Sequence, residues 1–595
     1  MLFGKHINRY YIRHLPALLL GTLALILVDY VQLLVPEFYR MVINGMNNGS
    51  VEVDGTLLPF DMTFLLDRIC LPLIGIIVCM VIGRFLWRIC FFGSGIKVET
   101  DLRGRMFDHC KDLSQEYYQV NKVGTLMSLF TNDLETVQDC FGSGILMLCD
   151  AVFLGGLALM KMAGMNPLLT GLSLIPLACL LAGGLITGRY MTIKWEKRQA
   201  AFSSLSDFSQ ESFAGIAVIK AFVKEGKELL AFKKLNANNE NINVEYTKLS
   251  TGLRISITLL IESVICIILG YGGYLVHEKV FNAGQLVEFI GYFTATVWPV
   301  MAVSELIEMR AKGKASLNRI SELLDTKPVV VDSPGATDDR PILGGIEFRD
   351  LTFRYPDGEY DVLQNVSLKI NAGENVGIVG KTGSGKTTLV DLILRTYNVP
   401  DGTVFIDGRD VNTIPIKTVR DHAAYVPQDN FLFSDTIEAN IAFASDKGSL
   451  DDVTRAAVLS DVDSNIREFK DGYSTVLGER GTTVSGGQKQ RISIARAIMK
   501  DAQILILDDS VSAVDVKTEK AILANLRELR QGKTTILIAH RITTIENMDK
   551  IIFIDDGKVL AVGRHEELLE KSPEYRTMVE LQRLDDLESN EKEGD

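Results

Sequence analysis

The sequence predicts two unlike halves, a membrane domain made of α-helices and, after it, a soluble α/β domain. The chain has 595 residues, which is too many for one hydrophobic core, so several domains are expected. Hydrophobic residues make up 47% of the chain, and the long uncharged runs lie in its first half. In the second half the apolar runs are short and end in a glycine-rich turn or an acid, as buried parallel strands do.

A helix needs about 20 apolar residues to cross a bilayer, and six segments of the first half are candidates. They are residues 15–35, a segment that begins near residue 69 and passes residue 83, and residues 141–162, 168–186, 255–276 and 286–303. A very short turn at Asn166-Pro167 joins the third to the fourth, and residues 277–285 join the fifth to the sixth. The predicted membrane domain therefore has six transmembrane helices.

The longer connections between these helices differ in charge. Residues 84–122 and 189–248 are rich in Lys and Arg. The loop after the first helix is acidic, with Glu52, Asp54, Asp61 and Asp67. Cytoplasmic loops favour Lys and Arg, so both basic connections and both termini are predicted to lie in the cytoplasm.

Two further features suggest how the cytoplasmic segments fold. Residues 98–111 and 195–213 have helical apolar spacing, so the membrane helices should continue far into the cytoplasm and turn back. The N-terminal residues 5–14 are basic and partly aromatic, which predicts an amphipathic stretch on the inner membrane face.

Asp29 and Glu262 are acids that fall inside predicted membrane helices, where a charge is costly and usually faces protein or water. They could contact a cationic substrate or couple to protons, or they could form structural hydrogen bonds between helices. Aromatic residues of the same helices could line a substrate cavity or pack between helices. These aromatic residues are Tyr30, Phe38, Phe289, Tyr292, Phe293 and Trp298. The eight cysteines, most of them in apolar runs, are predicted to be small buried hydrophobes.

Residues 380–387 match the pattern G-x-x-x-x-G-K-[ST] of a phosphate-binding loop. A predicted strand at residues 376–379 precedes the loop and a predicted helix at 388–394 follows it, which is the required context. Backbone N–H groups of such a loop surround a phosphate, Lys386 can reach the β- and γ-phosphates, and Thr387 can ligate Mg²⁺. The second half is therefore predicted to be an α/β P-loop NTPase nucleotide-binding domain that takes ATP and Mg²⁺. The predicted ATP-binding residues here are Gly380, Thr382, Gly383, Ser384, Gly385, Lys386, Thr387 and Thr388.

Two more apolar runs end in residues that suit this chemistry. Residues 504–507 are followed by Asp508, which is predicted to hold Mg²⁺ together with Thr387. Residues 535–539 are followed by His540, which can hydrogen-bond a γ-phosphate. A lone histidine is usually structural, but its place at the end of a core strand favours the functional interpretation.

The chain resembles the ATP-binding cassette (ABC) exporters along most of its length. Residues 124–128 with 131–133 resemble the first cytoplasmic loop of that family, and residues 210–216 with 219–222 resemble the second. In the family each loop tip is a short coupling helix that rests on the ATPase domain. The resemblance places these tips near residues 113–118 and 211–222.

The resemblance also implies roles for residues of the second half. Tyr355 stands where the family stacks an aromatic ring on adenine, and Gln428 stands in the Q-loop, where it reaches Mg²⁺ and the attacking water. Residues 478–481 resemble an exporter-specific segment, and residues 512–515 resemble the D-loop, which crosses the dimer interface. The signature at residues 484–488 covers ATP held by another subunit, which implies a head-to-tail pair of ATPase domains. Its ATP-contacting residues are Ser485, Gly486, Gly487 and Gln488.

One residue departs from the family pattern. Active sites of the family carry a glutamate as general base after the Walker B aspartate, whereas here that position is Asp509. An aspartate at this position together with a good signature is typical of one half of a bacterial heterodimeric exporter whose partner supplies the glutamate. The alternative is a homodimer that tolerates the aspartate. The chain's own site is predicted to turn ATP over slowly.

Together these observations predict one half of a multidrug-type ABC exporter, an ATPase that pumps hydrophobic or amphipathic small molecules across the cytoplasmic membrane. The predicted parts are a membrane domain at residues 1–325, a linker at 326–342, a nucleotide-binding domain at 343–582 and a disordered acidic tail at 583–595. The predicted partners are a second half-transporter, membrane lipid and the substrate. A net charge of −13 argues against nucleic acid.

Three alternatives remain open from the sequence. The first is a homodimeric exporter of peptides or lipids. The second is an ATP-gated channel or regulatory membrane sensor. The third is the ATPase subunit of an importer, which the fused membrane helices disfavour.

Overall fold

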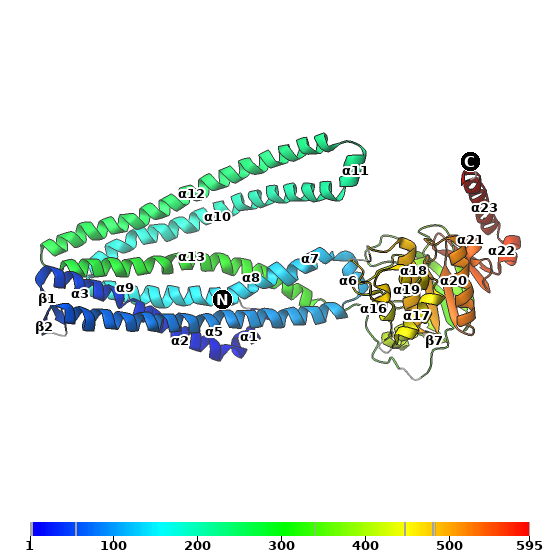
Figure 1. Ribbon diagram of the computed structural model, residues 1–595, viewed down its shortest axis with the longest axis horizontal. Helices are drawn as coiled ribbons and strands as arrows, with labels where there is room; N and C mark the ends of the chain where they lie inside the picture. The colour runs from blue at the N-terminus through cyan, green and yellow to red at the C-terminus, as the bar shows by residue number, and fades with distance from the viewer. Residues whose placement is uncertain are drawn as a thin grey trace. The chain divides into compact units, whose positions relative to one another are not determined.

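The computed structural model describes residues 4–53, 56–337, 340–445, 448–478, 481 and 483–593, and it divides into two compact units (Figure 1). Unit 1 consists of Met1–Lys111 and Val123–Thr326, and unit 2 of Asp112–Lys122 and Lys327–Asp595. Unit 1 contains the predicted membrane helices and unit 2 the phosphate-binding loop. The predicted membrane domain, residues 1–325, is thus interrupted by a short segment that packs with unit 2.

Unit 1 is helical apart from one hairpin. Its elements are α1 (Asn8–Arg13), α2 (Leu15–Gln32), α3 (Val35–Asn48), β1 (Ser50–Val53), β2 (Thr56–Pro59), α4 (Met62–Phe64), η1 (Leu65–Cys70), α5 (Leu71–Asp112), α7 (Val123–Ser128), η2 (Leu129–Asp133), α8 (Leu134–Cys149), η3 (Asp150–Leu154), α9 (Gly155–Met165), α10 (Pro167–Ala214), α11 (Ile216–Ala221), α12 (Glu225–His277) and α13 (Ala283–Asp325). Here η1, η2 and η3 are π-helical turns.

Five stretches of the described residues are helical, long and apolar enough to cross a membrane: Leu15–Asn48, Met62–Asp112, Val123–Met165, Glu225–His277 and Ala283–Asp325. Each contains one of the predicted membrane helices. The fourth predicted helix falls on α10, where Pro167–Pro176 is a shorter apolar piece and several of the following side chains lie outside the described part. The prediction that the basic connections are helical is confirmed, because α5, α10 and α12 continue through them.

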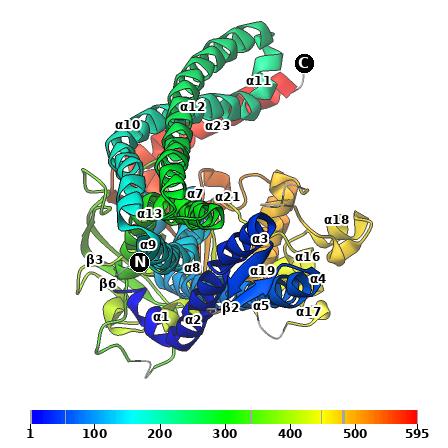
Figure 2. The same ribbon diagram turned by 90° about the vertical axis from the view of Figure 1, so that its left-hand side faces the viewer.

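Helices α10 and α12 run side by side, are joined by α11, and diverge from the bundle of α5, α8 and α13 (Figures 1 and 2). An aromatic cluster links the pair: the rings of Trp195 and Tyr246 are 5.7 Å apart, and the Arg198 guanidinium lies 5.0 Å from each ring centroid. Beyond this pair, apolar side chains near the turn are exposed, among them Phe213 and Phe222. Among the described residues, the end of this helix pair near the turn thus carries exposed apolar side chains.

A partly buried charged network joins α3, α9 and α13, and it was not singled out from the sequence. Glu37 of α3 pairs with Lys161 of α9 at 2.7 Å, and Arg40 of α3 pairs with Glu288 of α13 at 3.2 Å. The Tyr292 hydroxyl connects the two acids, donating to Glu288 at 2.9 Å. Opposite charges compensate one another here, which is how ionisable groups persist among membrane helices.

The N-terminal stretch packs against protein. Tyr10 of α1 is buried and its hydroxyl donates to Asp101 of α5, while Lys5 and His6 both pair with Asp325 at the end of α13. These contacts tie the start of the chain to α5 and to the end of α13. That this stretch also lies on the inner membrane face stays a prediction.

Burial in the structure bears on the two interpretations of the aromatic residues and on the prediction for the cysteines. Phe289, Tyr292 and Phe293 are fully buried in the unit 1 core, which supports packing between helices, whereas Tyr30 and Trp298 are exposed.

The prediction that the cysteines are buried holds for three of them and is wrong for three. Cys90, Cys140 and Cys149 are buried, whereas Cys70, Cys179 and Cys266 are exposed in this chain.

Unit 2 is built on two sheets. A six-stranded sheet has the order β12-β11-β5-β10-β9-β8, and all its strand pairs are parallel except that of the edge strand β12. A four-stranded antiparallel sheet has the order β4-β3-β6-β7. The strands are β3 (Ile346–Phe353), β4 (Leu363–Ile370), β5 (Asn375–Val379), β6 (Val404–Ile406), β7 (Arg409–Asp410), β8 (Ala423–Val426), β9 (Ile504–Asp508), β10 (Thr534–Ile538), β11 (Lys550–Asp555) and β12 (Lys558–Gly563).

Helices cover both faces of the larger sheet, as its uninterrupted apolar strands require. The helical elements of unit 2 are α6 (Gln115–Val120), α14 (Lys386–Ile393), η4 (Val411–Thr413), α15 (Ile416–Asp421), α16 (Ile437–Ala442), α17 (Leu450–Leu459), α18 (Asp463–Glu468), η5 (Gly472–Ser474), α19 (Gly486–Lys500), α20 (Val516–Leu529), α21 (Ile542–Ile545), α22 (His565–Lys571) and α23 (Pro573–Glu593). Ile504, Ile506 and Ile536 face the core that contains α14, whereas Leu505 and Leu507 face the core that contains α20 and α23.

One predicted feature of unit 2 is wrong. Residues 583–595 were expected to be disordered because they are acidic, but α23 continues to Glu593. Leu, Glu and Lys are strong helix formers, so a charged composition alone did not exclude a helix. The last two residues lie outside the described part of the chain.

Candidate nucleotide site

The parallel strands of the larger sheet bring the predicted site residues to one edge. In the register of the sheet, Ile378 of β5 lies beside Ile538 of β10, which lies beside Asp508 of β9. Because the strands are parallel, the residues that follow them lie at the same carboxyl edge. Gly380 follows β5, Asp509 follows β9 and His540 follows β10.

Gln428 reaches the same edge from β8. Val426 of that strand pairs with Leu507 of β9, and Gln428 comes two residues later with an exposed side chain. Of the residues predicted to be catalytic, Asp509, His540 and Gln428 are therefore all at the edge that carries the phosphate-binding loop.

The loop itself has the shape of an anion cradle. Gly383 and Gly385 have φ of +81° and +94°, a backbone conformation that glycine adopts without strain. A Cβ on Gly380 would lie 1.9 Å from the carbonyl oxygen of Ile554, so only glycine fits there. Ser384 Oγ is buried with no partner within the described part of the chain. A phosphate would supply that partner, so the loop fits a nucleotide.

Lys386 is held inside the cradle. Its Nζ donates to the carbonyl oxygens of Gly380 at 2.9 Å and Lys381 at 2.8 Å, and the residue is 6% exposed. Burial lowers the pKa of Lys386, although the nearby carboxylates of Asp508 and Asp509 oppose this. The ammonium group is therefore oriented before any ligand arrives, and a polyanion would offset the cost of burying it.

Two residues could hold Mg²⁺ beside the loop. Asp508 is 1% exposed, and it accepts hydrogen bonds from the Thr387 hydroxyl and, at 3.4 Å, from the Tyr425 hydroxyl. Burial raises the pKa of the Asp508 carboxyl, so a divalent cation would stabilise its ionised form. A hydroxyl and a carboxylate already in contact match the oxygen ligands that Mg²⁺ prefers.

Tyr355 lies against the helix that follows the loop. Its hydroxyl and Thr388 Oγ1 are 2.8 Å apart, and its ring makes edge contacts with Phe353 at 5.2 Å and Tyr397 at 5.1 Å. Tyr397 and the role of Tyr425 were not predicted from the sequence. Tyr425 lies inside strand β8, and the only sequence signal for its role is that it stands three residues before Gln428.

The signature residues form the start of α19. Ser485 caps the helix: its hydroxyl accepts from Gln488 N–H at 3.3 Å, and its own N–H donates to the Gln488 side chain at 2.9 Å. Gly486 faces open space. Residues 479, 480 and 482, which precede the cap, lie outside the described part of the chain. The exposed helix N-terminus presents backbone N–H groups and partial positive charge, which suits an anion.

The helix N-terminus also contacts the predicted D-loop. A Cβ on Gly487 would lie 3.0 Å from the Ala513 carbonyl oxygen. Gln490 connects α19 to both predicted motifs, because it accepts from Ala513 N–H at 3.0 Å and donates to the Asp509 carbonyl oxygen at 3.4 Å. Asp509 itself has φ of +46° and donates its N–H to Ile538 at 3.0 Å. The Walker B segment, the D-loop and the signature of one chain are thus mechanically linked.

Comparison with known proteins agrees with this arrangement. The family model described as the ABC transporter transmembrane region matches residues 18–300, and the one described as ABC transporter matches residues 363–512. The probable multidrug resistance ABC transporter ATP-binding/permease protein YheI of Bacillus subtilis is 34% identical over 98% of this chain and 97% of its own length. The chain belongs to the ABC transporter family. It is therefore a multi-pass membrane protein with an ATPase coupled to transport.

Other members of the ABC transporter family are similar over the whole length. The multidrug resistance-like ATP-binding protein MdlA of Escherichia coli is 32% identical over 97% of this chain and 96% of its own. A solved structure of a bacterial Atm1-family ABC exporter with ATP bound superposes with a TM-score of 0.76, covering 97% of this chain and 98% of that one. At 24% identity this likeness shows that the fold is shared.

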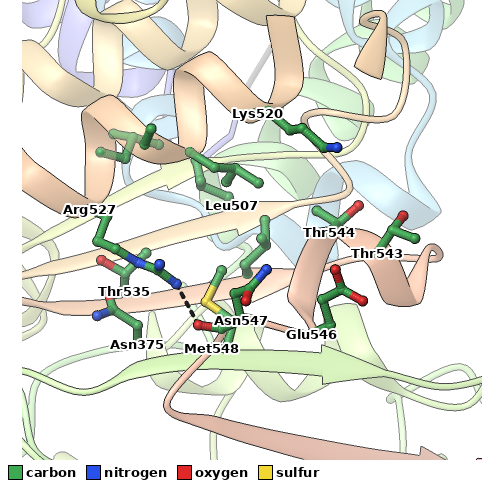
Figure 3. A pocket seen from close by; sticks show the side chains of 14 residues that line it. Asn375, Leu507, Lys520, Arg527, Thr535, Thr543, Thr544, Glu546, Asn547 and Met548 are labelled. Carbon is green, nitrogen blue, oxygen red and sulfur yellow. Dashed lines mark hydrogen bonds between the residues drawn. The ribbon is translucent and has the colours of Figure 1, made fainter. Parts of the chain in front are cut away.

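Two pockets of unit 2 lie away from the phosphate-binding loop. One of about 270 Å³ lies between α20, α21 and the sheet, where Leu507, Lys520, Arg527 and Thr544 line it (Figure 3). It contains no predicted site residue. The other, of about 480 Å³, is lined in part by Tyr425, whose hydroxyl reaches Asp508.

Lys386→Ala is expected to weaken ATP binding by this ABC transporter chain about tenfold or more, because a charged hydrogen bond contributes about 1.5–3 kcal/mol. Photolabelling of this subunit with an ATP analogue at graded concentrations measures the change. Lys381→Ala is the matched control, since the Lys381 side chain is exposed and pairs with Asp555. Equal labelling of wild type and Lys386→Ala would contradict the assignment of this loop.

Asp391→Asn is expected to stabilise unit 2 in a pH-dependent way. Burial and the nearby Asp508 raise the pKa of Asp391 to about 6. Near pH 4 the Asp391 carboxyl is largely protonated in the folded chain and hardly lowers the folding stability. Above pH 6 it is ionised and lowers that stability by about 3 kcal/mol, since each pKa unit corresponds to about 1.4 kcal/mol. Thermal unfolding without nucleotide should show a higher midpoint for the variant at pH 8 and nearly the same midpoint at pH 4. A gain that is equal at both pH values, or one reproduced by the exposed control Asp357→Asn, would contradict this account.

Proposed function

We propose that the chain is one half of an ATP-driven exporter of hydrophobic or amphipathic small molecules, paired with a different chain in the cytoplasmic membrane. The observation that carries the proposal is the sheet edge where Lys386, Asp508, Asp509 and His540 meet, fused in one chain to a membrane unit. The printed names of the relatives YheI and MdlA, which refer to multidrug resistance, support the substrate class. Both termini would lie in the cytoplasm.

The chain's own residues can bind and orient ATP in defined ways. Tyr355 would stack on adenine after giving up its contact with Thr388, and the loop N–H groups with Lys386 would hold the β- and γ-phosphates. Thr387, Asp508 and Gln428 would hold Mg²⁺, which supplies charge neutralisation at the phosphates when bound. His540 would hydrogen-bond the γ-phosphate.

A structural path could report nucleotide binding to the membrane helices. Helix α6 packs as part of unit 2, whereas α5 before it and α7 after it belong to unit 1, so the chain enters unit 2 and leaves it again at this point. Gln119 of α6 hydrogen-bonds Tyr397, whose ring contacts Tyr355 at 5.1 Å. Ser114 Oγ accepts from the N–H groups of Val329 and Val330 at 3.0 Å, which ties the same segment to the linker.

The pairing with a second chain rests on two features. Ser485, Gly486, Gly487 and Gln488 would cover ATP held by the partner, in a head-to-tail arrangement. The exposed apolar residues at the α10–α12 turn also need a covering surface, which a second chain can provide. Asp509 in place of a glutamate supports a partner that differs from this chain.

Transport by inside-out membrane vesicles tests the proposal. Vesicles that contain the assembled pair should accumulate a fluorescent amphipathic dye when ATP is added, and vesicles with Lys386→Ala in this chain should accumulate less. An ATP-gated channel would dissipate a dye gradient without building one, and a sensor would do neither. A homodimeric exporter would transport without the second chain, and a peptide or lipid exporter would leave the dye unmoved.

A further inference from the structure

Two acidic side chains lie close to one another between the membrane helices of unit 1. Asp29 of α2 is 3% exposed and Asp150, the first residue of η3, is 7% exposed. The two carboxylates interact electrostatically, and η3 packs against both α2 and α13. Asp29 was singled out from the sequence, whereas Asp150 was overlooked although it lies inside the predicted helix at residues 141–162.

The two acids differ in how their oxygens are satisfied. Trp298 Nε1 of α13 donates to Asp150 Oδ2 at 2.8 Å. Asp29 Oδ2 is buried and has no hydrogen-bond partner among the described residues. Burying an unpaired carboxylate oxygen is unfavourable because it loses its contact with water, and a positively charged partner would offset that cost.

The charges around the two acids leave room for one cation. Arg84 is the basic residue that interacts with Asp29, but its Nη2 donates to Gln32 at 3.2 Å and its side chain is exposed. A bound cation favours the ionised form of both acids, and with both ionised these three groups together carry one net negative charge. A monovalent cation balances it.

The surroundings favour an organic cation. The Trp298 ring is 44% exposed although its N–H donates to Asp150. Aromatic faces bind organic cations well in a setting of low polarity. The backbone adds a local irregularity, because η3 is a π-helical turn, a feature found often at functional sites.

We propose that Asp29 and Asp150 form a binding site for the charged group of a lipophilic organic cation, with Trp298 contacting its apolar part. The inference rests on the exporter function proposed above and names organic cations as its substrate class. Glu262, the other acid predicted in a membrane helix, is exposed on α12 in this chain and is not part of the site.

Binding of tetraphenylphosphonium to the assembled exporter in nanodiscs, without ATP, tests the site. Asp29→Asn and Asp150→Asn should each weaken binding about tenfold or more, because each removes a charged partner. Asp150→Glu keeps the charge and should retain most of the affinity, and Glu262→Gln should bind as wild type does. Triphenylphosphine oxide, a neutral molecule of similar shape, should bind equally to all variants.

Specific outcomes would overturn the inference. Unchanged tetraphenylphosphonium binding in both asparagine variants would show that the acids have only a structural role. An equal loss of binding for the neutral probe would show general damage to the helices. In that case Asp150→Glu, which keeps the charge, is the deciding variant: it should bind tetraphenylphosphonium better than Asp150→Asn does, and equal binding by the two would overturn the inference. Because no ATP is present, a failure of vesicle transport would contradict the exporter function and leave the binding result interpretable by itself.

Discussion

Gly487→Asp in this chain is expected to remove nearly all ATPase activity of the assembled exporter, a loss of about a hundredfold or more. The N-terminus of α19 presents its N–H groups at Gly486 and Gly487, and in the proposed head-to-tail pair the partner's γ-phosphate lies there. A carboxylate at that point would repel the phosphate, and losing one such donor site costs about 10²–10³ in rate. Steady-state ATPase of the reconstituted pair measures the loss.

A matched control separates charge from damage. Gly487→Asn places a neutral side chain of similar size against the Ala513 carbonyl oxygen, so it has the steric cost without the charge and should keep clearly more activity than Gly487→Asp. ATP binding at this chain's own loop should be unchanged in Gly487→Asp, because Lys386 and Thr387 do not contact the changed residue. A Gly487→Asp variant with near-normal ATPase would contradict the head-to-tail arrangement.

Asp509→Glu is expected to speed ATP turnover at this chain's own site by about a hundredfold. A glutamate extends the carboxylate by about 1.5 Å, one carbon–carbon bond. A general base must lie about 2.6–3.2 Å from the water it activates, and a misplacement of about 1 Å can cost a hundredfold. Single-turnover hydrolysis in the assembled pair should show a slow phase in wild type that becomes fast in the variant.

Asp509→Ala provides the comparison for that result. It should leave the fast phase unchanged and lower total ATPase only modestly, because the fast site uses the partner's Walker motifs. If Asp509→Glu gave no faster phase, the length of the side chain at residue 509 would not be what limits the rate of hydrolysis at this site. The φ of +46° at Asp509 would then be the feature to examine, since it fixes the direction of the side chain.

The nucleotide edge could be predicted in detail because its determinants are local. A strand, a glycine-rich loop and a helix follow one another within residues 375–393, so the motif carries its own geometry. The residues that end β9 and β10 could be placed beside it because parallel strands align their carboxyl ends. The membrane helices were found for a similar reason, since a bilayer demands long apolar runs that are visible in the sequence.

The remaining features depend on contacts between distant residues. Glu37 meets Lys161 and Arg40 meets Glu288 across more than a hundred positions, and no local pattern pairs them. The packing of Asp112–Lys122 with unit 2 is of the same kind. Asp150 was overlooked because its meaning comes from Asp29 and Trp298, which belong to two other helices. Composition misled at the C-terminus, where acidic residues form a helix.

The ATPase activity of this chain purified alone, compared with the same chain carrying Asp509→Ala, tests the central claim most directly. The claim is that the chain is half of an asymmetric ATP-driven exporter whose working site needs the partner's Walker motifs and this chain's signature. The predicted result is slow hydrolysis that Asp509→Ala hardly changes, with full activity restored when a partner is added. Brisk hydrolysis by the chain alone, abolished by Asp509→Ala, would show that Asp509 is a working base and that the exporter is a homodimer.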